Sequence, residues 1–260
     1  MTVLRRAMYF AVMVAGLSLA PAVGMTAQPC PPPQFSVSGG TSVTTTCPTA
    51  SSGSYSTSFS LTENPISEGG KWVNGETNGL NWSNVQTGSG NAYGSRIVDA
   101  NSVCRYCDPI AHISKSFMVF NANQYAQGTV YRVPGYSNPS GGHEVELLLR
   151  FEITAGSARG YEVIWSQEGW IFIVRWNGPQ SDYTELQSSG APVAVAVDGD
   201  VLRAEIGGDN RVRVYKNGVL VLTGPPDATY TTGQPGMGFW PTPGSTVSSY
   251  GWKDYTAGNL

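Results

Sequence analysis

The sequence predicts an all-β protein in which two antiparallel sheets pack as a sandwich. The chain has 32 glycines and 17 prolines but only 13% charged residues, and this composition is typical of turn-rich β structure. Short runs of alternating polar and apolar residues follow one another, separated by Gly, Pro or Asn, and no long segment has a helical period. About 200 residues follow the N-terminal region, which is enough for one sandwich with a sizeable core.

Residues 1–27 have the features of a secretory signal peptide. Arg5 and Arg6 precede an uninterrupted apolar run, residues 7–20, and small residues follow it at Ala22, Gly24 and Ala27. This order predicts export, with cleavage after residue 24 or 27. The run is shorter than the roughly 20 residues that a bilayer core requires, and no second apolar stretch follows. We therefore expect a secreted protein, extracellular, on the cell surface or periplasmic, with no membrane span after removal of the signal.

Residues 28–55 are rich in Pro, Ser, Thr and Gly, with three consecutive prolines at 31–33. This low-complexity composition predicts a leader or linker that buries little apolar surface. The sandwich domain is then expected over residues 56–260.

Four cysteines lie in the exported part of the chain. Because that part enters an oxidising compartment, disulfides are expected. Sequence proximity favours Cys30 with Cys47 and Cys104 with Cys107, while three connectivities are possible for four cysteines.

The net charge argues against a nucleic-acid partner. Removal of the signal peptide takes away two arginines and no carboxylates, which leaves 13 basic and 18 acidic residues, or a net charge of −5. The basic residues Arg211, Arg213 and Lys216 stand in an alternating strand pattern rather than in a patch, so nucleic-acid binding is not expected.

The alternating runs predict strands in the following order along the chain. They cover residues 56–62, 128–133, 143–153, 160–166, 170–176, 201–206, 211–216 and 219–222, with a closing strand over 247–255. Asn217-Gly218 between two of these runs is the strongest local signal for a β-hairpin.

The longest run, residues 143–153, has a clear two-residue period. Its apolar residues Val145, Leu147, Leu149, Phe151 and Ile153 are predicted to face the core. The opposite face is then predicted to carry Glu144, Glu146, Arg150 and Glu152 toward solvent.

Several segments together resemble the bacterial concanavalin A-like and LamG-like domains, which are jelly-roll sandwiches. They are residues 63–72, 100–133, 160–163, 175–178, 198–203, 215–218 and 233–238. The resemblance covers about residues 56–258 and implies a jelly-roll fold. It does not imply one activity, because this superfamily includes lectins, glycoside hydrolases and polysaccharide lyases.

The resemblance implies that one sheet face binds a polysaccharide or glycan. The candidate ligand-binding residues are Glu146, Arg150, Glu162 and Arg175 on that face, with Tyr131, Trp170 and Tyr183 as aromatic platforms. Aromatic walls with a few polar groups are typical of small-molecule sites. The plainer interpretation is that the charged residues form ion pairs on an open sheet face.

A glucanase of this fold is expected to carry three acids on one strand. Here Glu144-Val-Glu146 begins such a pattern, but residues 148 and 149 are both Leu, so the general acid is missing. The leading hypothesis is a non-catalytic carbohydrate-binding or adhesive module. The alternatives are a polysaccharide-active enzyme with a rearranged site and a structural surface protein.

The resemblance also implies a structural calcium ion between the first and last strands. Glu63 and Asp254 are the candidate ligands, because Ca²⁺ takes oxygen ligands that usually include a carboxylate. No other cofactor is predicted.

Overall fold

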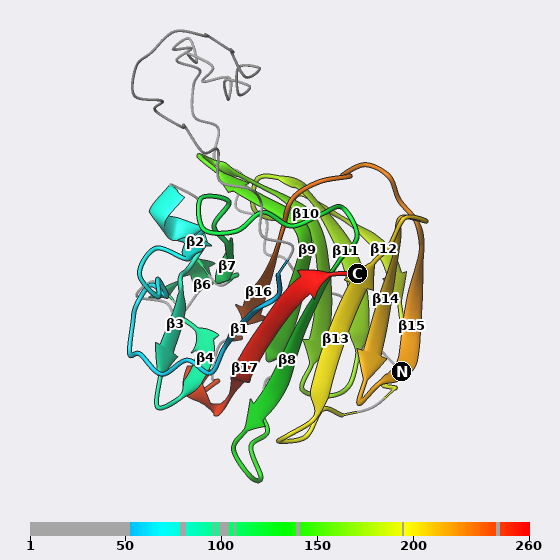
Figure 1. Cartoon of the computed structure of the whole chain (residues 1–260). Coiled ribbons are helices and arrows are strands. Elements are labelled where there is room, and N and C mark those ends of the chain that lie inside the picture. Colours follow the sequence, from blue (N-terminus) through cyan, green and yellow to red (C-terminus); the bar gives the residue numbers. More distant parts are fainter. Residues whose placement is uncertain are drawn as a thin grey trace, which may run out of the picture. The chain divides into compact units, whose positions relative to one another are not determined.

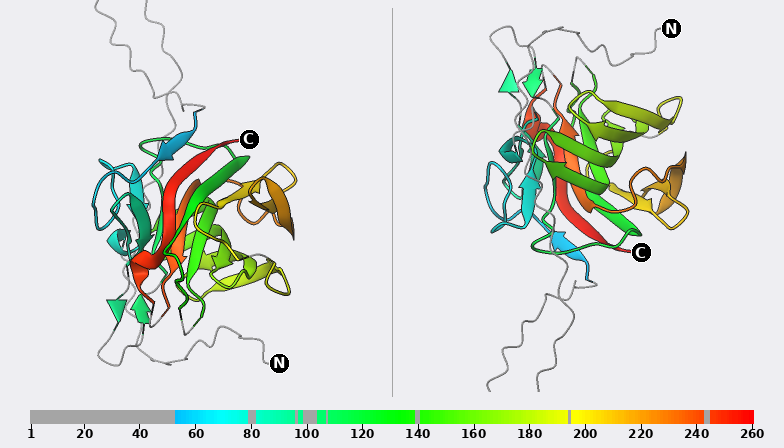
Figure 2. Two further views of the ribbon diagram at one scale, coloured as in Figure 1. Left: turned by 90° about the horizontal axis from the view of Figure 1, so that it is seen from below. Right: turned by 90° about the horizontal axis from the view of Figure 1, so that it is seen from above.

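The computed structural model of this chain describes residues 53–78, 82–95, 97–98, 104–106, 108–138, 141–193, 195–242 and 245–260. Two large antiparallel sheets lie face to face within these residues, and the described residues contain no α-helix (Figure 1, Figure 2). No helix of this part of the chain is long and apolar enough to cross a bilayer. The predicted all-β, two-sheet antiparallel sandwich is confirmed.

One sheet has eight strands and contains both the first and the last strand of the fold. Its order is β15 (Val219–Pro226), β14 (Arg211–Lys216), β13 (Val201–Ile206), β8 (Gln124–Arg132), β17 (Tyr250–Asn259), β4 (Asn91–Gly94) and β3 (Val85–Gly88), and β1 (Tyr55–Thr57) also pairs with β17. The chain's last strand therefore lies in the middle of this sheet (Figure 1).

The second sheet has seven strands and carries the candidate site. Its order is β12 (Tyr183–Ser188), β11 (Ile171–Gly178), β10 (Ser157–Ser166), β9 (Glu144–Thr154), β16 (Gln234–Trp240), β7 (Ile110–Ile113) and β2 (Trp72–Asn74). A small third sheet pairs β5 (Ile97–Val98) with β6 (Cys104–Tyr106), and the 3₁₀ turns η1 (Glu76–Asn78) and η2 (Val247–Ser249) complete the described elements.

The predicted hairpin between residues 211 and 222 is confirmed. β14 has the predicted bounds, and β15 continues four residues beyond its predicted end. Asn217 and Gly218 have φ angles of 51° and 79°, the left-handed conformations that a tight two-residue hairpin turn requires.

The predicted first strand, residues 56–62, is wrong in its extent. β1 ends at Thr57, and Phe59 adopts a left-handed φ of 53°. This local turn breaks the alternation, so Phe59 is buried while Leu61 is 50% exposed. Strands β2 to β7 were not predicted, because runs of two to four residues leave little or no alternation in the sequence. β12, which is mostly polar, and β16, which contains a proline and two glycines, were not predicted as strands either.

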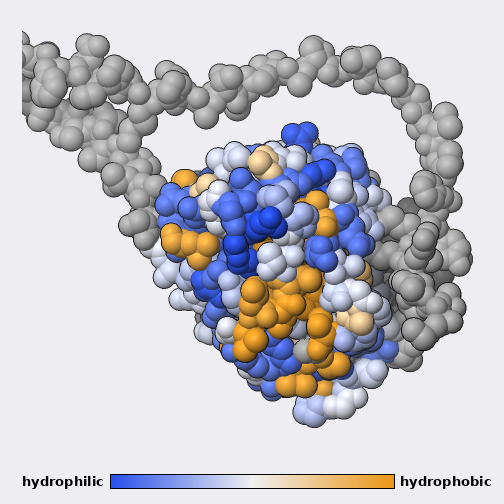
Figure 3. Space-filling model, turned by 90° about the vertical axis from the view of Figure 1, so that its right-hand side faces the viewer, coloured by the Kyte–Doolittle hydropathy of each residue, from blue (hydrophilic) through white to orange (hydrophobic). Residues whose placement is uncertain are grey.

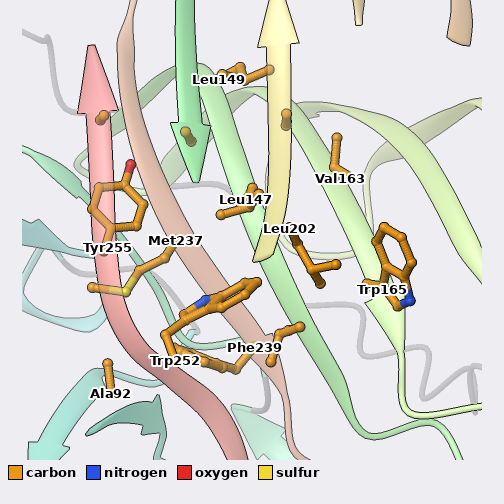
Figure 4. Close-up of a cluster of buried hydrophobic side chains, with 14 of the residues drawn as sticks. Ala92, Leu147, Leu149, Val163, Trp165, Leu202, Met237, Phe239, Trp252 and Tyr255 are labelled. Carbon is orange, nitrogen blue, oxygen red and sulfur yellow. The ribbon is translucent and has the colours of Figure 1, made fainter. Parts of the chain in front are cut away.

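The main core lies between the two sheets. Figure 4 shows Leu147, Leu149, Val163 and Trp165 of the seven-stranded sheet and Leu202, Trp252 and Tyr255 of the eight-stranded sheet in this space. The predicted inward direction of Val145, Leu147 and Leu149 is confirmed. Each fully buried side chain of this size contributes about 1.5–3 kcal/mol of transfer free energy.

Apolar side chains also reach the surface on the side of the molecule where β15 forms a sheet edge (Figure 3). Val219 is 65% exposed and Leu220 is 50% exposed, whereas Val221 and Leu222 pack against the core. The first two residues of this edge strand therefore lie outside the core.

Candidate functional site

The outer face of the seven-stranded sheet is the face turned away from the other sheet. Alternation and register place Glu144, Glu146 and Leu148 of β9, Glu162 and Ile164 of β10, and Val174 and Trp176 of β11 on it. Glu146 is in register with Ile164, and Glu162 with Leu148. The two glutamates are thus diagonal neighbours on adjacent strands, a spacing that long side chains can bridge. The structure brings these two predicted site residues together.

A β-bulge in β9 changes the alternation after Leu149. Relative to β10, β9 contains one extra residue between Leu149 and Glu152, and Arg150 has a φ of 45°. An extra residue transfers every later side chain to the other face of the sheet. Phe151 and Ile153 accordingly belong to the outer-face cluster, and the prediction that they face the main core is wrong.

The bulge also removes Arg150 from the outer face. Its guanidinium donates from Nε to the carbonyl of Ala122 (2.8 Å), from Nη1 to Asn210 Oδ1 (2.7 Å) and Tyr230 O (3.0 Å), and from Nη2 to Gly207 O (3.1 Å). Only 2% of the residue is exposed, and burial lowers the pKa of its guanidinium. The prediction that Arg150 shares a face with Glu146 is wrong.

Arg175 likewise lies on the opposite side of the sheet from Glu162. It alternates with Val174 and Trp176 of the outer face, and it is in register with Tyr161, a residue of the main core. Its guanidinium pairs with Asp227, which also accepts a hydrogen bond from the Tyr161 hydroxyl at 2.9 Å. The predicted ion pairs of Glu146 and Glu162 with Arg150 and Arg175 are therefore not formed.

Glu146 and Glu162 are buried instead of solvent-exposed. Their exposed fractions are 0% and 1%, and their carboxyl groups lie within hydrogen-bonding reach of each other. Burial, followed by the charge of Glu162, raises the pKa of Glu146 well above its ordinary value. Gly238 of β16 makes room for the pair, because a Cβ at that position would lie 2.4 Å from Glu146 Oε2.

A second apolar cluster covers this part of the outer face. Its buried members are Trp82, Ile110, Leu148, Phe151, Ile153, Ala158, Ile164, Val174 and Trp176. Trp82 comes from the segment that follows η1, and its ring centroid lies 4.6 Å from that of Trp176. Trp176 in turn donates a hydrogen bond from Nε1 to Glu162 Oε2 at 2.9 Å. No pattern in the sequence indicates this cover, because Trp82 is a single aromatic residue outside any alternating run.

Partly exposed aromatic side chains lie beyond this cover, toward the β11–β12 edge of the sheet. Trp170, in the turn between β10 and β11, stacks on Phe172 with ring centroids 6.3 Å apart and an interplanar angle of 15°. The ring of Tyr183, on β12, lies beside that of Trp176, with the two ring centroids 5.3 Å apart. Phe172 is in register with Ser188 of β12. Of the predicted aromatic platforms, Trp170 and Tyr183 therefore lie on the same sheet as Glu146 and Glu162.

Tyr131 lies elsewhere. It belongs to β8 of the eight-stranded sheet and alternates with Val130, which is buried in the main core. Its side chain thus points away from the seven-stranded sheet, and the structure does not bring it together with the other candidates.

The two calcium candidates each accept hydrogen bonds from backbone amides. Glu63 accepts from the N–H groups of Ser67 and Glu68 at 3.0–3.1 Å, and Asp254 accepts from Thr129 N–H at 3.0 Å. Among the described residues, no group of three or more His, Cys, Asp or Glu side chains could hold a metal ion. A calcium ion held with help from other oxygen ligands stays a prediction.

The side chains of Cys30, Cys47, Cys104 and Cys107 lie outside the described residues, so their pairing also stays a prediction.

Several buried titratable residues were not among the predicted site residues, and His112 is one of them. His112 of β7 donates from Nδ1 to the carbonyl of Ile113 at 2.8 Å, and desolvation lowers the pKa of its imidazole to about 4. The ring is neutral near pH 7.

No family model matches this chain, and no curated protein sequence matches it. Among solved structures it is similar to the carbohydrate-binding module CBM66 from Bacillus subtilis, with 16% identity, a TM-score of 0.46, and coverage of 75% of this chain and 96% of that chain. It is also similar to β-agarase A in complex with oligoagarose, with 11% identity, a TM-score of 0.48, and coverage of 78% and 89%. It is similar, too, to a β-glucanase of Bacillus licheniformis, with 15% identity, a TM-score of 0.40, and coverage of 80% of this chain and 95% of that chain. The identities are low and all three TM-scores lie below 0.5, so this likeness says nothing about the activity or the ligand of this chain.

Proposed function

We propose that this protein is a secreted, non-catalytic carbohydrate-binding module whose ligand lies across Trp170 and Phe172. The supporting observation is the stacked, partly exposed Trp170–Phe172 pair. The two rings are nearly parallel and both are partly exposed, so they form an aromatic platform, and the apolar face of a sugar ring packs well on an exposed aromatic ring. Sites for small molecules add a few polar groups to apolar walls, and Ser188 on the neighbouring strand β12 provides one.

The carboxyl pair favours binding over hydrolysis. A retaining glycosidase holds its two carboxyl groups about 5–5.5 Å apart, and an inverting one holds them about 6.5–9.5 Å apart, with the substrate between them. Glu146 and Glu162 lie within hydrogen-bonding reach of each other and are buried, so no sugar fits between them in this arrangement. The alternative, a polysaccharide-active enzyme, requires this pair to separate.

The proposal is tested by measuring binding of the mature protein to a panel of soluble polysaccharides by affinity electrophoresis and calorimetry. Trp170→Ala removes half of the platform and is expected to weaken binding about thirtyfold, or about 2 kcal/mol, the usual effect of truncating an aromatic anchor. Tyr131→Ala is the matched control, since this partly exposed aromatic residue lies on the other sheet, and its affinity should equal that of the wild type.

Each result has a distinct meaning. Weaker binding by Tyr131→Ala together with unchanged binding by Trp170→Ala would refute the proposed platform. Release of reducing ends or unsaturated products from a bound polysaccharide would favour the enzyme. A wild-type protein that binds none of the panel would favour a structural surface protein.

A further inference from the structure

The buried carboxyl pair on the outer face has an unusual set of neighbours. Three of its four oxygens, Glu146 Oε1 and Oε2 and Glu162 Oε1, have no hydrogen-bond donor when both groups are treated as carboxylates. The fourth oxygen accepts the indole N–H of Trp176. The rest of the immediate surroundings is the apolar cluster around Leu148 and Ile164.

The charged groups acting on Glu146 within the described residues are all acidic. They are Glu162, Asp108 and Glu144, and Arg150 and Arg175, the arginines expected to neutralise this face, lie on its other side. Two ionised carboxylates in contact, without water or a cation, would carry a desolvation cost of several kcal/mol each and would repel each other.

One proton resolves this conflict, because it turns the repulsive contact into a short O–H···O⁻ hydrogen bond. We propose that Glu146 and Glu162 hold one shared proton at neutral pH, and that its loss at alkaline pH destabilises the seven-stranded sheet. The raised pKa of Glu146 agrees with this geometry. The proton belongs to the pair and not to either residue.

The direction of the pH effect follows from which state binds more protons. In the unfolded chain both glutamates ionise near pH 4.3, whereas the folded protein retains one proton above that pH. The folded state then binds more protons than the unfolded state, so stability falls as pH rises. The equilibrium constant for folding is expected to fall about tenfold per pH unit until the pair ionises.

The test combines a direct and an indirect measurement. In wild-type protein with ¹³C-labelled glutamate, one carboxyl carbon should keep the chemical shift of a protonated acid from about pH 5 to above about pH 7, well beyond the range of an ordinary glutamate. Glu146→Gln and Glu162→Gln keep the shape of the side chain and donate an amide N–H to the remaining carboxylate. Both variants should lack the protonated signal.

Urea unfolding between about pH 7 and about pH 9 gives the second readout. The free energy of unfolding of the wild type should fall across this range. That of both Gln variants should change less with pH, and at the alkaline end both variants should be more stable than the wild type. Glu152→Gln is the control, because Glu152 is exposed and pairs with Lys115, and it should retain the wild-type slope.

The proposal is refuted if every glutamate carboxyl titrates below about pH 5.5, or if the Gln variants keep the wild-type slope. A cation in place of the proton would be revealed by a stability that depends on added metal and chelator, and it would overturn the proposal too. None of these outcomes depends on whether the protein binds a glycan.

Discussion

The guanidinium of Arg150 connects three loops at one end of the sandwich. Its acceptors lie just before β8, between β13 and β14, and between β15 and β16. Arg150→Met would leave these buried acceptors without a donor, so we expect the free energy of unfolding to fall by about 3–5 kcal/mol. Arg150→Lys should recover only part of this lost stability, because one ammonium group cannot reach all the acceptors of a planar guanidinium. Chemical denaturation measures both.

Arg159→Met is the control for this prediction, because Arg159 is exposed and should change stability by no more than about 0.5 kcal/mol. Glycan binding by folded Arg150→Lys should equal that of the wild type, since this side chain points away from the outer face. A variant of Arg150 with normal stability and no glycan binding would show that this residue belongs to the ligand surface, as the alternation in the sequence predicts.

At the scale of elements, the bulge in β9 depends on two glycines that surround Arg150. Gly160 on β10 has a φ of +140°, and Gly233, just before β16, has a φ of +143°. A Cβ at Gly233 would lie 2.2 Å from the carbonyl carbon of Arg150, and neither backbone can move without breaking the sheet. Glycine in a strand often marks a bulge or such a close approach.

Gly233→Ala is expected to destabilise the protein by more than about 3 kcal/mol or to prevent folding. Gly156→Ala is the matched control: this glycine also has a positive φ, of +71°, but nothing lies within 4 Å of its Cβ position, so its cost should be only about 1 kcal/mol. Thermal unfolding of both variants measures the difference. Equal, small losses would show that β9 can lose its bulge without disrupting the fold.

At the scale of the whole molecule, two buried groups give stability opposite pH dependences. The imidazole of His112 has a pKa of about 4 in the fold and 6.5 as its ordinary value. Between these values the unfolded state binds more protons, so this contribution is lost as pH falls from 6.5 to 4. Above about pH 4.5 the carboxyl pair has the opposite effect, because its contribution to stability falls as pH rises. Up to about pH 6.5 the two changes of stability with pH therefore cancel.

We therefore expect a plateau of stability between about pH 4.5 and about pH 6.5, with a decline on the alkaline side. On the acid side, the carboxyl groups whose pKa values are lowered also lose their stabilising contributions as they become protonated. These groups are Glu152, Asp198, Asp200, Asp209 and Asp227. Urea midpoints measured across pH give the profile, and His112→Gln should turn the plateau into a continuous decline. A wild-type stability that increases steadily from about pH 6.5 to about pH 8.5 would contradict this account.

Local patterns in the sequence were enough to predict the sandwich, the β14–β15 hairpin and the inward direction of Val145, Leu147 and Leu149. Each of these depends on alternation over a few residues or on the conformations that Asn217 and Gly218 adopt readily, and both are properties of a short stretch of chain. Glu162 was identified in the same way, as the polar residue among the core side chains of its strand.

The composition of the candidate site was decided by tertiary structure. A single extra residue at Arg150 reverses the faces of everything after it in β9. The two glycines that permit it, Gly160 and Gly233, lie 10 and 83 residues after Arg150 in the chain. Periodicity within one strand contains no information about such a distant contact. The burial of Glu146 and Glu162 likewise depends on Trp82, which lies 64 residues before Glu146 in the chain. Local sequence thus predicted most of the longer strands, and only the packing of distant segments decided which of their residues share a face and which carboxyl groups are removed from water.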